Sequence, residues 1–314
     1  MSATKTDELC PQCSKIRFDE ISFDTSADLP AWANCARHDF SGRSTCPLCR
    51  LIQFTIEVSA DSPSNITSIK LRWESSDRKI RVLDHKTSLH FVREPSSTAA
   101  VYKVGLPVSG SMIDLQRARF WLDFCTSKHQ ACNLKTASYS QQGKTTELVT
   151  LRVIDVVSKC IAQVKMPCKY VTLSYVWGGV ANFRLTSNNQ AMLSQPGILT
   201  QVWMRIPRTI RDAIEAVQTL GEKYLWVDSL CLIQNDHSDM QRGIAIMDLI
   251  YENALFSIIA AGSSHANTGI AGVGSTSRIV TQRLQQITPN IALACHIDVE
   301  HLLKQTTYNR RGWT

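Results

Sequence analysis

Three short apolar runs alternate with two segments of helical periodicity between Tyr170 and Ala261, and this alternation constrains the fold more than any other feature. The runs are rich in β-branched and aromatic residues and cover Tyr170–Val176, Tyr224–Ile233 and Ala254–Ala261. Short apolar strands separated by amphipathic helices are typical of β-α-β crossovers. The sequence therefore predicts an α/β domain built on a parallel sheet.

Polar side chains gather where the first two runs end, and open α/β sheets bind their ligands at the carboxyl ends of such strands. The candidate site residues there are Ser174, Tyr175, Trp177, Asp228 and Asp236. Asp228 is the most informative, because a carboxylate within an apolar strand costs several kcal/mol unless it is paired or hydrogen-bonded. Two roles are open for it: a buried structural anchor with Arg208 as partner, or an acid in a ligand site.

The segment between these two runs predicts a loop followed by a helix. Asn182–Gly197 is polar and irregular, which predicts a mobile loop over the site. Pro207 suits the first turn of a helix, and Gly221 suits the position just after its end. Arg208 lies in the first turn, where the helix dipole opposes a cation. An anion or carboxylate partner would explain this placement, and a solvated arginine is the simpler alternative.

The first fifty residues contain cysteine and histidine positions with ligand-like spacing. Two pairs, Cys10-x-x-Cys13 and Cys46-x-x-Cys49, would let four thiolates converge on one tetrahedral ion. Cys35-x-x-His38 lies between them and makes the ligand set ambiguous. We predict one structural zinc ion held by the four cysteines of the two pairs, with His38 as the substitute ligand. Unliganded thiols are the alternative.

Composition excludes several classes of function. The formal net charge is +7, but Lys and Arg are scattered, so no nucleic-acid partner is predicted. No apolar stretch approaches the ~20 residues that span a bilayer, and the first residues lack a secretory signal. We therefore expect a soluble cytoplasmic protein without membrane contact. In that compartment the eleven cysteines are expected to be thiols or metal ligands rather than disulfides.

Three domains are predicted: a Cys/His-rich zinc module at residues 1–50, a β-rich and helical region at 51–149, and the α/β domain at 150–314. Ser68–Trp73 and Lys79–Leu83 alternate as antiparallel strands do, and Ser111–Cys125 has one apolar helical face. Three possible ligands follow that helix at four- and three-residue intervals: Cys125, His129 and Cys132. They indicate either a second metal site or a helix end packed on the core.

Several blocks, in order along the chain, closely resemble the HET domain of fungal heterokaryon-incompatibility proteins. They are Tyr170–Gly178 (YVTLSYVWG), Ile206–Ala213 (IPRTIRDA), Tyr224–Asp236 (YLWVDSLCLIQND), Met247–Ala254 (MDLIYENA) and Arg311–Thr314 (RGWT). The resemblance covers about residues 150–314. In that family the last block usually continues into more chain, so we expect a domain truncated at its C-terminal end.

The resemblance implies a role in non-self recognition between fungal individuals and in programmed cell death after incompatible fusion. The implied partners are other proteins of the incompatibility system, or further copies of the same chain. The family has been compared with TIR domains, which are flavodoxin-like α/β modules. A TIR-like, flavodoxin-like fold is therefore expected for the HET domain, with signalling by protein association as the leading function.

Some TIR domains cleave NAD at the nicotinamide bond, which makes an NAD-cleaving hydrolase the second hypothesis. A carboxylate would then stabilise an oxocarbenium-like ribosyl centre, as in glycoside hydrolysis. Asp228 and Asp236 are the candidate catalytic carboxylates. Arg208 would lie near the phosphates, and the other residues expected to bind ligand are Ser174, Tyr175 and Trp177.

One departure from the family bears on the enzyme hypothesis. Members commonly carry a Trp and then a Glu in the helix before Met247–Ala254, where this chain has Met240 and Gly243. If that Glu is the catalytic group, this chain lacks it, so whether the chain is an enzyme is left open. Cys231 and His237 offer a third reading, a Cys-His hydrolase, although a cysteine in an apolar strand is more often inert.

Overall fold

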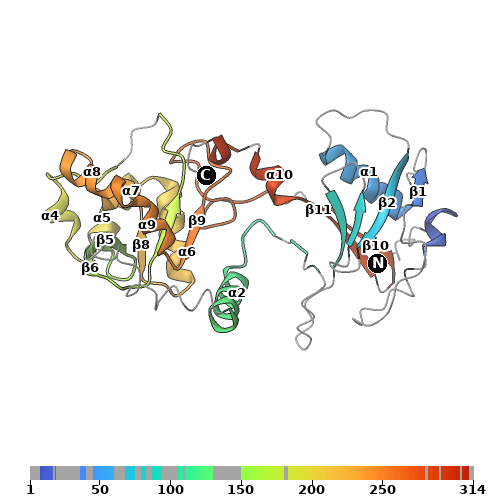
Figure 1. The fold of residues 1–314 in the computed structure, drawn as a ribbon, viewed down its shortest axis with the longest axis horizontal. Helices are drawn as coiled ribbons and strands as arrows, with labels where there is room; N and C mark the ends of the chain where they lie inside the picture. Colours follow the sequence, from blue (N-terminus) through green and yellow to red (C-terminus); the bar gives the residue numbers. More distant parts are fainter. Residues whose placement is uncertain are drawn as a thin grey trace. The chain divides into compact units, whose positions relative to one another are not determined.

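The computed structural model describes residues 8–16, 18, 36–39, 45–59, 68–74, 79–82, 87–92, 105, 107–108, 110–129, 150–179, 183–279, 282–289, 291–304 and 306–310. The chain divides into two compact units, each with its own sheet (Figure 1). Unit 1 consists of Met1–Ser109 and Val280–Lys304, and unit 2 of Gly110–Ile279 and Gln305–Thr314. The division into residues 1–50, 51–149 and 150–314 stays a prediction.

Unit 2 is built on a five-stranded sheet with the order β6-β5-β8-β7-β9. The strands are β5 (Thr150–Asp155), β6 (Cys160–Lys165), β7 (Val171–Ser174), β8 (Tyr224–Trp226) and β9 (Phe256–Ile259). β7 lies between β8 and β9 and is parallel to both, which confirms the predicted alternation of strands and helices. β5 is antiparallel to β6 and to β8, so the sheet is mixed and is parallel only over the three predicted strands.

The antiparallel edge has a local cause in the turn between β5 and β6. The Asp155 carboxylate accepts hydrogen bonds from the backbone N–H groups of Val157 and Ser158, at 3.0 and 2.7 Å. Lys159 then adopts a φ of 52°, which completes the reversal. A turn this short can join only antiparallel strands, because parallel strands need a crossover of a dozen or more residues.

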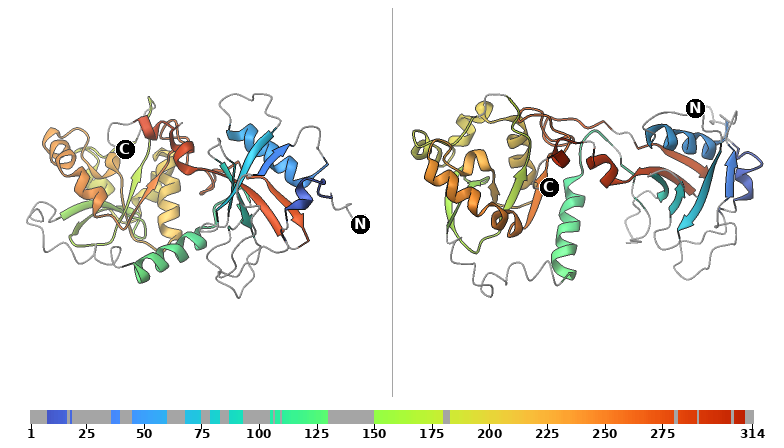
Figure 2. Two further views of the ribbon diagram at one scale, coloured as in Figure 1. Left: turned by 45° about the vertical axis from the view of Figure 1, so that its right-hand side comes forward. Right: turned by 45° about the horizontal axis from the view of Figure 1, so that its top comes forward.

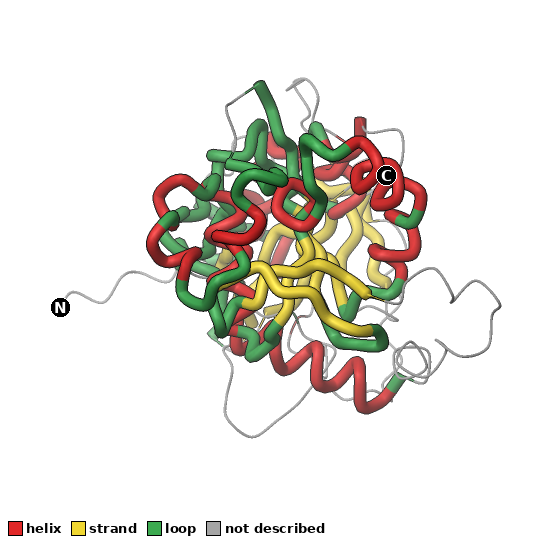
Figure 3. Tube along the Cα trace, turned by 90° about the vertical axis from the view of Figure 1, so that its left-hand side faces the viewer, coloured by secondary structure: helices red, strands yellow, loops and turns green. Residues whose placement is uncertain are grey.

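Two helical crossovers connect the three parallel strands. The first contains α4 (Gln190–Leu193), α5 (Ile198–Gln201), η5 (Trp203–Arg205) and α6 (Arg208–Thr219). The second contains α7 (Asp228–Cys231), α8 (His237–Ala245) and α9 (Met247–Glu252). Figure 3 traces the chain with the strands in yellow and the helices in red. This arrangement buries Tyr170, Leu173 and Trp226 in one apolar cluster.

The helix predicted after Pro207 is α6, and its apolar stripe is buried as expected. Ile210, Ala213, Ile214 and Val217 are each fully inaccessible to solvent. The helix ends at Thr219. Gly221 then takes a φ of 76°, the left-handed conformation that favours glycine after a helix end.

Two other predictions in this region were wrong. The apolar run Tyr224–Ile233 is not one strand, because β8 ends at Trp226 and residues 228–231 form the helical turn α7. Its apolar character reflects the burial of both elements. The segment predicted as a mobile loop is packed from residue 183 onwards, since Leu185 and Leu193 are fully buried. Leu185 also exchanges backbone hydrogen bonds with Ser229 and Gln234, both at 2.9 Å.

Unit 1 contains a six-stranded antiparallel sheet with the order β1-β2-β3-β4-β11-β10. The strands are β1 (Ala36–Asp39), β2 (Ser68–Glu74), β3 (Lys79–Val82), β4 (Thr87–Val92), β10 (Leu284–Thr288) and β11 (Ile291–Ile297). The other described elements of this unit are η1 (Cys13–Lys15), α1 (Pro47–Ser59) and α10 (Val299–Lys304). β2 and β3 confirm the strands predicted near residues 68–73 and 79–83.

The helix α2 (Leu115–Lys128) precedes β5 in unit 2 and begins at an Asp114 cap. With 14 residues it is the longest helix of the described chain. No described helix is long and apolar enough to cross a membrane.

Two neighbouring histidines in the sheet of unit 1 should make the stability of this unit depend on pH. The rings of His90 on β4 and His296 on β11 lie 4.5 Å apart between centroids. Burial lowers the pKa of His296, and although Asp298 acts against this, Lys79 adds to it. The unfolded chain therefore binds the proton more readily than the folded one. We expect the free energy of unfolding of unit 1 to fall as the pH is lowered through the ordinary histidine pKa of 6.5.

The effect can be measured by unfolding the protein in urea above and below that pH. Hydrogen exchange of β4 and β11 then reports the unfolding of unit 1. Because much of the His296 side chain stays exposed, the change should be modest. His296→Gln is expected to flatten the pH dependence. The same slope in the wild type and in this variant would show that other groups are responsible.

Candidate functional site

Two neighbouring parallel strands of unit 2 bring polar side chains together at their carboxyl ends. Tyr175 and Trp177 follow β7, while Asp228 and Ser229 follow β8. The Tyr175 hydroxyl donates to the Ser229 Oγ at 2.8 Å, and the Trp177 Nε1 donates to the Asp228 Oδ2 at 2.9 Å. Three of the predicted site residues, Tyr175, Trp177 and Asp228, therefore lie in one cluster. Their functional role stays a prediction.

Asp228 is held differently from the buried strand carboxylate that the sequence suggested. It is the first residue of α7 and is half-buried. Its Oδ1 accepts a hydrogen bond from the Ser229 N–H at 2.7 Å, so each carboxylate oxygen has a donor from this site. The Gln234 Nε2 donates to the Asp228 carbonyl at 3.1 Å. The carboxylate is thus oriented by groups from both strand ends.

Arg184 joins this cluster and was not identified from the sequence. Its guanidinium lies over the Trp177 ring, 4.9 Å from the ring centroid, in cation–π geometry. The Arg184 side chain is exposed, whereas Tyr175 is buried. Burial, followed by the negative charge of Asp228, raises the pKa of Tyr175, so its hydroxyl keeps the proton it donates to Ser229. A lone arginine in a polar segment carries no spacing signal that could have revealed it.

Gly178 determines the backbone direction immediately after Trp177. It has a φ of 68°, and a Cβ added there would lie 2.4 Å from the Cβ of His265 and 3.0 Å from its Cα. The next residue, Ala266, donates its N–H to the Trp177 carbonyl at 3.1 Å. Position 178 therefore requires glycine, because the backbone is left-handed there and no room is left for a Cβ. The hydrogen bond also shows that the loop after β9 packs against the end of β7.

Arg208, predicted as a ligand-binding residue or as the partner of Asp228, contacts a different part of unit 2. Its Nη2 donates to the Ser275 carbonyl at 2.7 Å and to the Ser275 Oγ at 3.0 Å. Ser275 belongs to the glycine-rich loop that follows β9, which contains Gly262, Gly269, Gly272 and Gly274. The structure therefore brings Arg208 to that loop rather than into a hydrogen bond with Asp228.

The same loop is anchored by a buried carboxylate on α6 that sequence reasoning missed. Asp212, which is 2% exposed, accepts hydrogen bonds from the Ile270 N–H at 2.8 Å and the Thr276 hydroxyl at 2.7 Å. Thr209 accepts from the Gly269 N–H at 3.1 Å. This segment is therefore tied to α6. Asp212 lies on the side of α6 away from the apolar stripe, so the helical pattern gives no sign of its burial.

The two remaining predicted residues of unit 2 have structural contacts. Asp236 is the cap of α8, where its Oδ1 accepts hydrogen bonds from the Ser238 and Asp239 N–H groups at 2.9 and 3.1 Å. Ser174 is the last residue of β7, and its carbonyl accepts from the Ala260 N–H at 2.9 Å. Neither of these contacts places the residue in the cluster of Trp177 and Asp228.

Two further sequence hypotheses concern α7 and α8. Burial raises the pKa of the Cys231 thiol to about 12, which argues against a nucleophilic thiolate and supports an inert core cysteine. Gly243, which stands where the family commonly has Glu, is buried against Leu232. An added Cβ would lie 2.3 Å from the Leu232 Cδ2, so a glutamate here would require Leu232 to move.

Trp177→Phe is expected to lower the free energy of unfolding of unit 2 by about 1 kcal/mol, because it removes one donor from a half-buried carboxylate. Urea unfolding followed by circular dichroism measures the difference. The matched control is Trp203→Phe, since the Trp203 indole has no hydrogen bond to any residue of the described chain. Equal losses in both variants would mean that ring size, and not the bond to Asp228, sets the cost.

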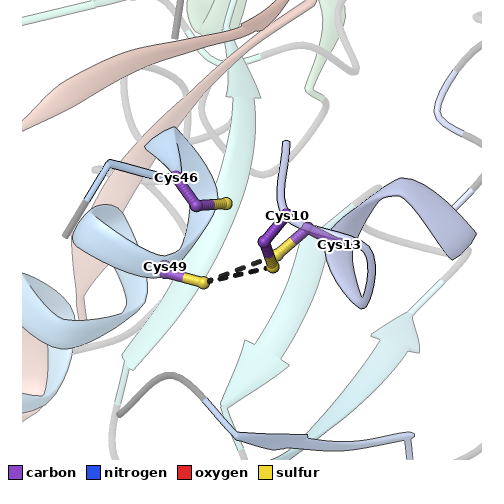
Figure 4. A group of neighbouring side chains, drawn as sticks. All are labelled: Cys10, Cys13, Cys46 and Cys49. Carbon is purple, nitrogen blue, oxygen red and sulfur yellow. Dashed lines mark hydrogen bonds between the residues drawn. The ribbon is translucent and has the colours of Figure 1, made fainter. Parts of the chain in front are cut away.

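The four cysteines of the two predicted pairs converge in unit 1. Cys10 and Cys13 come from the segment around η1, and Cys46 and Cys49 from the start of α1 (Figure 4). All four Sγ atoms lie within 4.8 Å of one another. Hydrogen bonds from Cys13 and then Cys49 lower the pKa of Cys46, as expected where one thiolate is surrounded by thiols. The group can hold a metal ion.

The sulfur separations fit a tetrahedral metal site. Zinc–sulfur bonds of about 2.3 Å in tetrahedral geometry place the sulfur atoms about 3.8 Å apart. The Cys49 Sγ lies 3.8 Å from that of Cys10 and 3.6 Å from that of Cys13. The prediction of these four residues as one ligand group is therefore compatible with structural zinc. The His38 side chain lies outside the described residues, although its backbone pairs with β2.

The second metal site considered from the sequence is described only in part. The Cys125 Sγ and the His129 Nδ1 lie 3.3 Å apart at the end of α2, and Cys132 lies outside the described residues. α2 has no buried residue, so its end does not pack into a core as the alternative proposed.

Comparison with known protein families identifies the C-terminal part of the chain. Residues 170–314 match the model of the family described as "Heterokaryon incompatibility protein (HET)". Neither the curated proteins nor the solved structures contain a match. The matched range begins at β7 and contains both strand ends of the polar cluster, which confirms the resemblance seen in the sequence blocks. Residues 170–314 of this chain therefore match a domain of the heterokaryon incompatibility (HET) family.

Proposed function

We propose that this chain acts in heterokaryon incompatibility as a non-self recognition module whose HET domain triggers programmed cell death. The observation that carries this proposal is the family match over residues 170–314. The module signals by associating with other proteins of the incompatibility system or with further copies of itself, in the cytoplasm of a fungal cell. A TIR-like arrangement of the HET domain is part of the proposal, supported by the parallel strands β8, β7 and β9.

The contacts of the polar cluster favour association over chemistry. Both oxygens of Asp228 accept hydrogen bonds, from Ser229 and from Trp177, so the carboxylate is already used in holding two strand ends together. Arg184 presents an exposed cation on the Trp177 ring. An ordered, exposed side chain on a rigid platform suits recognition of a partner surface.

Expression of the chain in a fungal host tests the proposal. We expect growth arrest and loss of membrane integrity, and we expect both to persist with Asp228→Asn, which keeps an acceptor for the Trp177 donor. Arg184→Ala is expected to reduce the toxicity. The matched control is Arg242→Ala, which removes an exposed arginine on α8. Normal growth with folded protein at detectable levels would contradict the proposal.

An NAD-cleaving hydrolase is the second candidate. The observation that favours it is a carboxylate, an aromatic ring and a cation, from Asp228, Trp177 and Arg184, at the carboxyl ends of parallel strands. Asp228 would stabilise the developing positive charge on the ribose. Purified protein incubated with NAD should then release nicotinamide, and Asp228→Asn should abolish the release. No turnover at high concentration of folded protein would remove this candidate.

We further propose that the metal held by the four cysteines is zinc, because thiolate ligands in tetrahedral geometry suit this ion. Metal analysis of the native protein is expected to find one equivalent. The double variant Cys46→Ser/Cys49→Ser should lose it, whereas Cys168→Ser, a half-buried cysteine of unit 2, should retain it. Less than about half an equivalent in native protein would contradict the proposal, since such a site folds around its ion.

A further inference from the structure

The hairpin formed by β10 and β11 belongs to unit 1, although its residues lie within the range matched by the HET family. β11 pairs antiparallel with β4, from Ala292 opposite Val92 to Ile297 opposite Thr87. Figure 2 shows the red strands of the hairpin beside the cyan strands of the N-terminal part in both views. A segment of the HET region thus completes a sheet whose other strands come from the first hundred residues.

The hairpin is held by burial as well as by backbone pairing. Leu293 and Ala294 are fully inaccessible to solvent, and Ile287, Ile291 and Cys295 are at most 6% exposed. Their burial removes apolar surface from water, which is the main stabilising contribution to such a contact. If the hairpin left, β4 would present an unpaired edge and the core of unit 1 would be exposed.

The helix α1 connects the hairpin to the four cysteines. Cys46 immediately precedes α1 and Cys49 lies in its first turn, and along the helix Leu48, Leu51, Ile52 and Ile56 are buried. α1 contacts β4, β10 and β11. Cys13, Cys46 and Cys49 belong to the same buried cluster as Ile291, Leu293 and Cys295. The metal ligands and the hairpin are therefore parts of one core.

We propose that metal binding by Cys10, Cys13, Cys46 and Cys49 controls whether the hairpin at residues 284–297 is docked on β4 and α1. The inference rests on the proposed zinc site. The metal joins the segment around η1 to the start of α1 and closes the loop between Cys13 and Cys46, which lowers the entropy lost when unit 1 folds. Its binding free energy then stabilises α1 in the position that covers the hairpin. Loss of the metal releases the HET region's hairpin.

Unit 2 provides an internal control for this inference. Its core cluster runs from Leu151 to Ala266 and contains no residue of the hairpin. Its sheet is complete without the hairpin, since β10 and β11 pair only with each other and with β4 among the described strands. Metal removal should therefore change unit 1 and leave the parallel strands of unit 2 folded.

Hydrogen exchange of the full chain, read by mass spectrometry, tests the proposal. Protein with one equivalent of zinc is compared with protein from which a chelator has removed the zinc under reducing conditions, and again after zinc is returned. We expect exchange in β4, β10 and β11 to rise by about tenfold or more on removal and to be restored by zinc. Exchange in β7, β8 and β9 should be unchanged. Cys46→Ser/Cys49→Ser should behave as the zinc-free protein, and Cys168→Ser as the wild type.

A second variant separates the hairpin from the metal site. Leu293→Ala should raise exchange in β10 and β11 while the protein keeps its equivalent of zinc, because the ligands lie on other elements. If zinc binds and hairpin exchange does not depend on it, the control of docking is refuted and the metal site stands. If no zinc binds, the metal proposal fails and this inference fails with it. Equal rises in unit 1 and unit 2 would show general unfolding and would also overturn the proposal.

Discussion

Trp226→Ala is expected to lower the free energy of unfolding of unit 2 by about 3–5 kcal/mol. Trp226 lies on β8, between β5 and β7, and is completely inaccessible to solvent. Its ring meets that of Tyr251 edge-on, with 5.7 Å between centroids. Truncation would leave a cavity that strands on both sides prevent from closing. Since domains are stable by only about 5–15 kcal/mol, this loss should be visible in urea unfolding followed by circular dichroism.

Trp226→Phe makes a sharper test of the same site. The Trp226 indole N–H is buried without a hydrogen-bond partner in the described part of the chain, and such a group costs about 1–3 kcal/mol. Phenylalanine fills less space but removes this cost. We therefore expect the phenylalanine variant to lose no more than about 1.5 kcal/mol. Equal losses for Phe and Ala would mean that the indole N–H is satisfied in solution.

Asp212→Ala is expected to cost unit 2 about 2–4 kcal/mol, measured in the same way. The substitution leaves two donors buried near α6, the Ile270 N–H and the Thr276 hydroxyl, without their acceptor. It also frees the glycine-rich loop, which approaches the carboxylate so closely that a Cβ on Gly269 would lie 2.8 Å from its Oδ2. We expect this loop to become sensitive to proteases in the variant.

Asp248→Ala is the matched control, because this carboxylate lies in the first turn of α9 and is exposed. Its loss should change stability far less than the loss of Asp212. The double variant Asp212→Ala/Thr276→Val removes one of the two stranded donors and should be more stable than Asp212→Ala alone. If the double variant is less stable, the hydroxyl of Thr276 has another acceptor and the account of this anchor is wrong.

α6 and the cysteine group could be predicted because each depends on a pattern of residues close together in the sequence. α6 could be placed because a proline, an apolar stripe and a glycine all indicate the same helix, and the structure buries Ile210, Ile214 and Val217 accordingly. The cysteine group could be predicted because two short pairs each bring two thiols to one ion. Here the sequence spacing itself encodes the geometry.

Other features could not be read from the sequence for physical reasons. An apolar run such as Tyr224–Ile233 has the same composition whether it is one strand or a strand followed by a buried helical turn. Asp228 looked like a buried strand residue for that reason. The pairing of β11 with β4 depends on a partner far away in the sequence, which no local periodicity reveals.

The candidate site could also be predicted only where neighbouring strand ends bring residues together. Trp177 and Asp228 could be expected near each other, since parallel neighbouring strands place their carboxyl ends side by side. Arg184 lies over the Trp177 ring next to the buried Leu185, and neither contact is visible in the local sequence pattern. Arg208, whose position at a helix start suggested an anion, instead contacts Ser275.

The place of β11 in the sheet of unit 1 has a consequence during protein synthesis. About 200 residues separate β4 from β11, so at 5–20 residues per second the ribosome needs roughly 10–40 seconds to supply the partner strand. In that time the backbone groups of residues 87–92 have no neighbour on this side, and an open strand edge can pair with other chains. Newly made protein should therefore depend on chaperones at this stage. Unit 1 takes segments from both sides of residues 110–279, so its sheet is incomplete until residue 297 has been added.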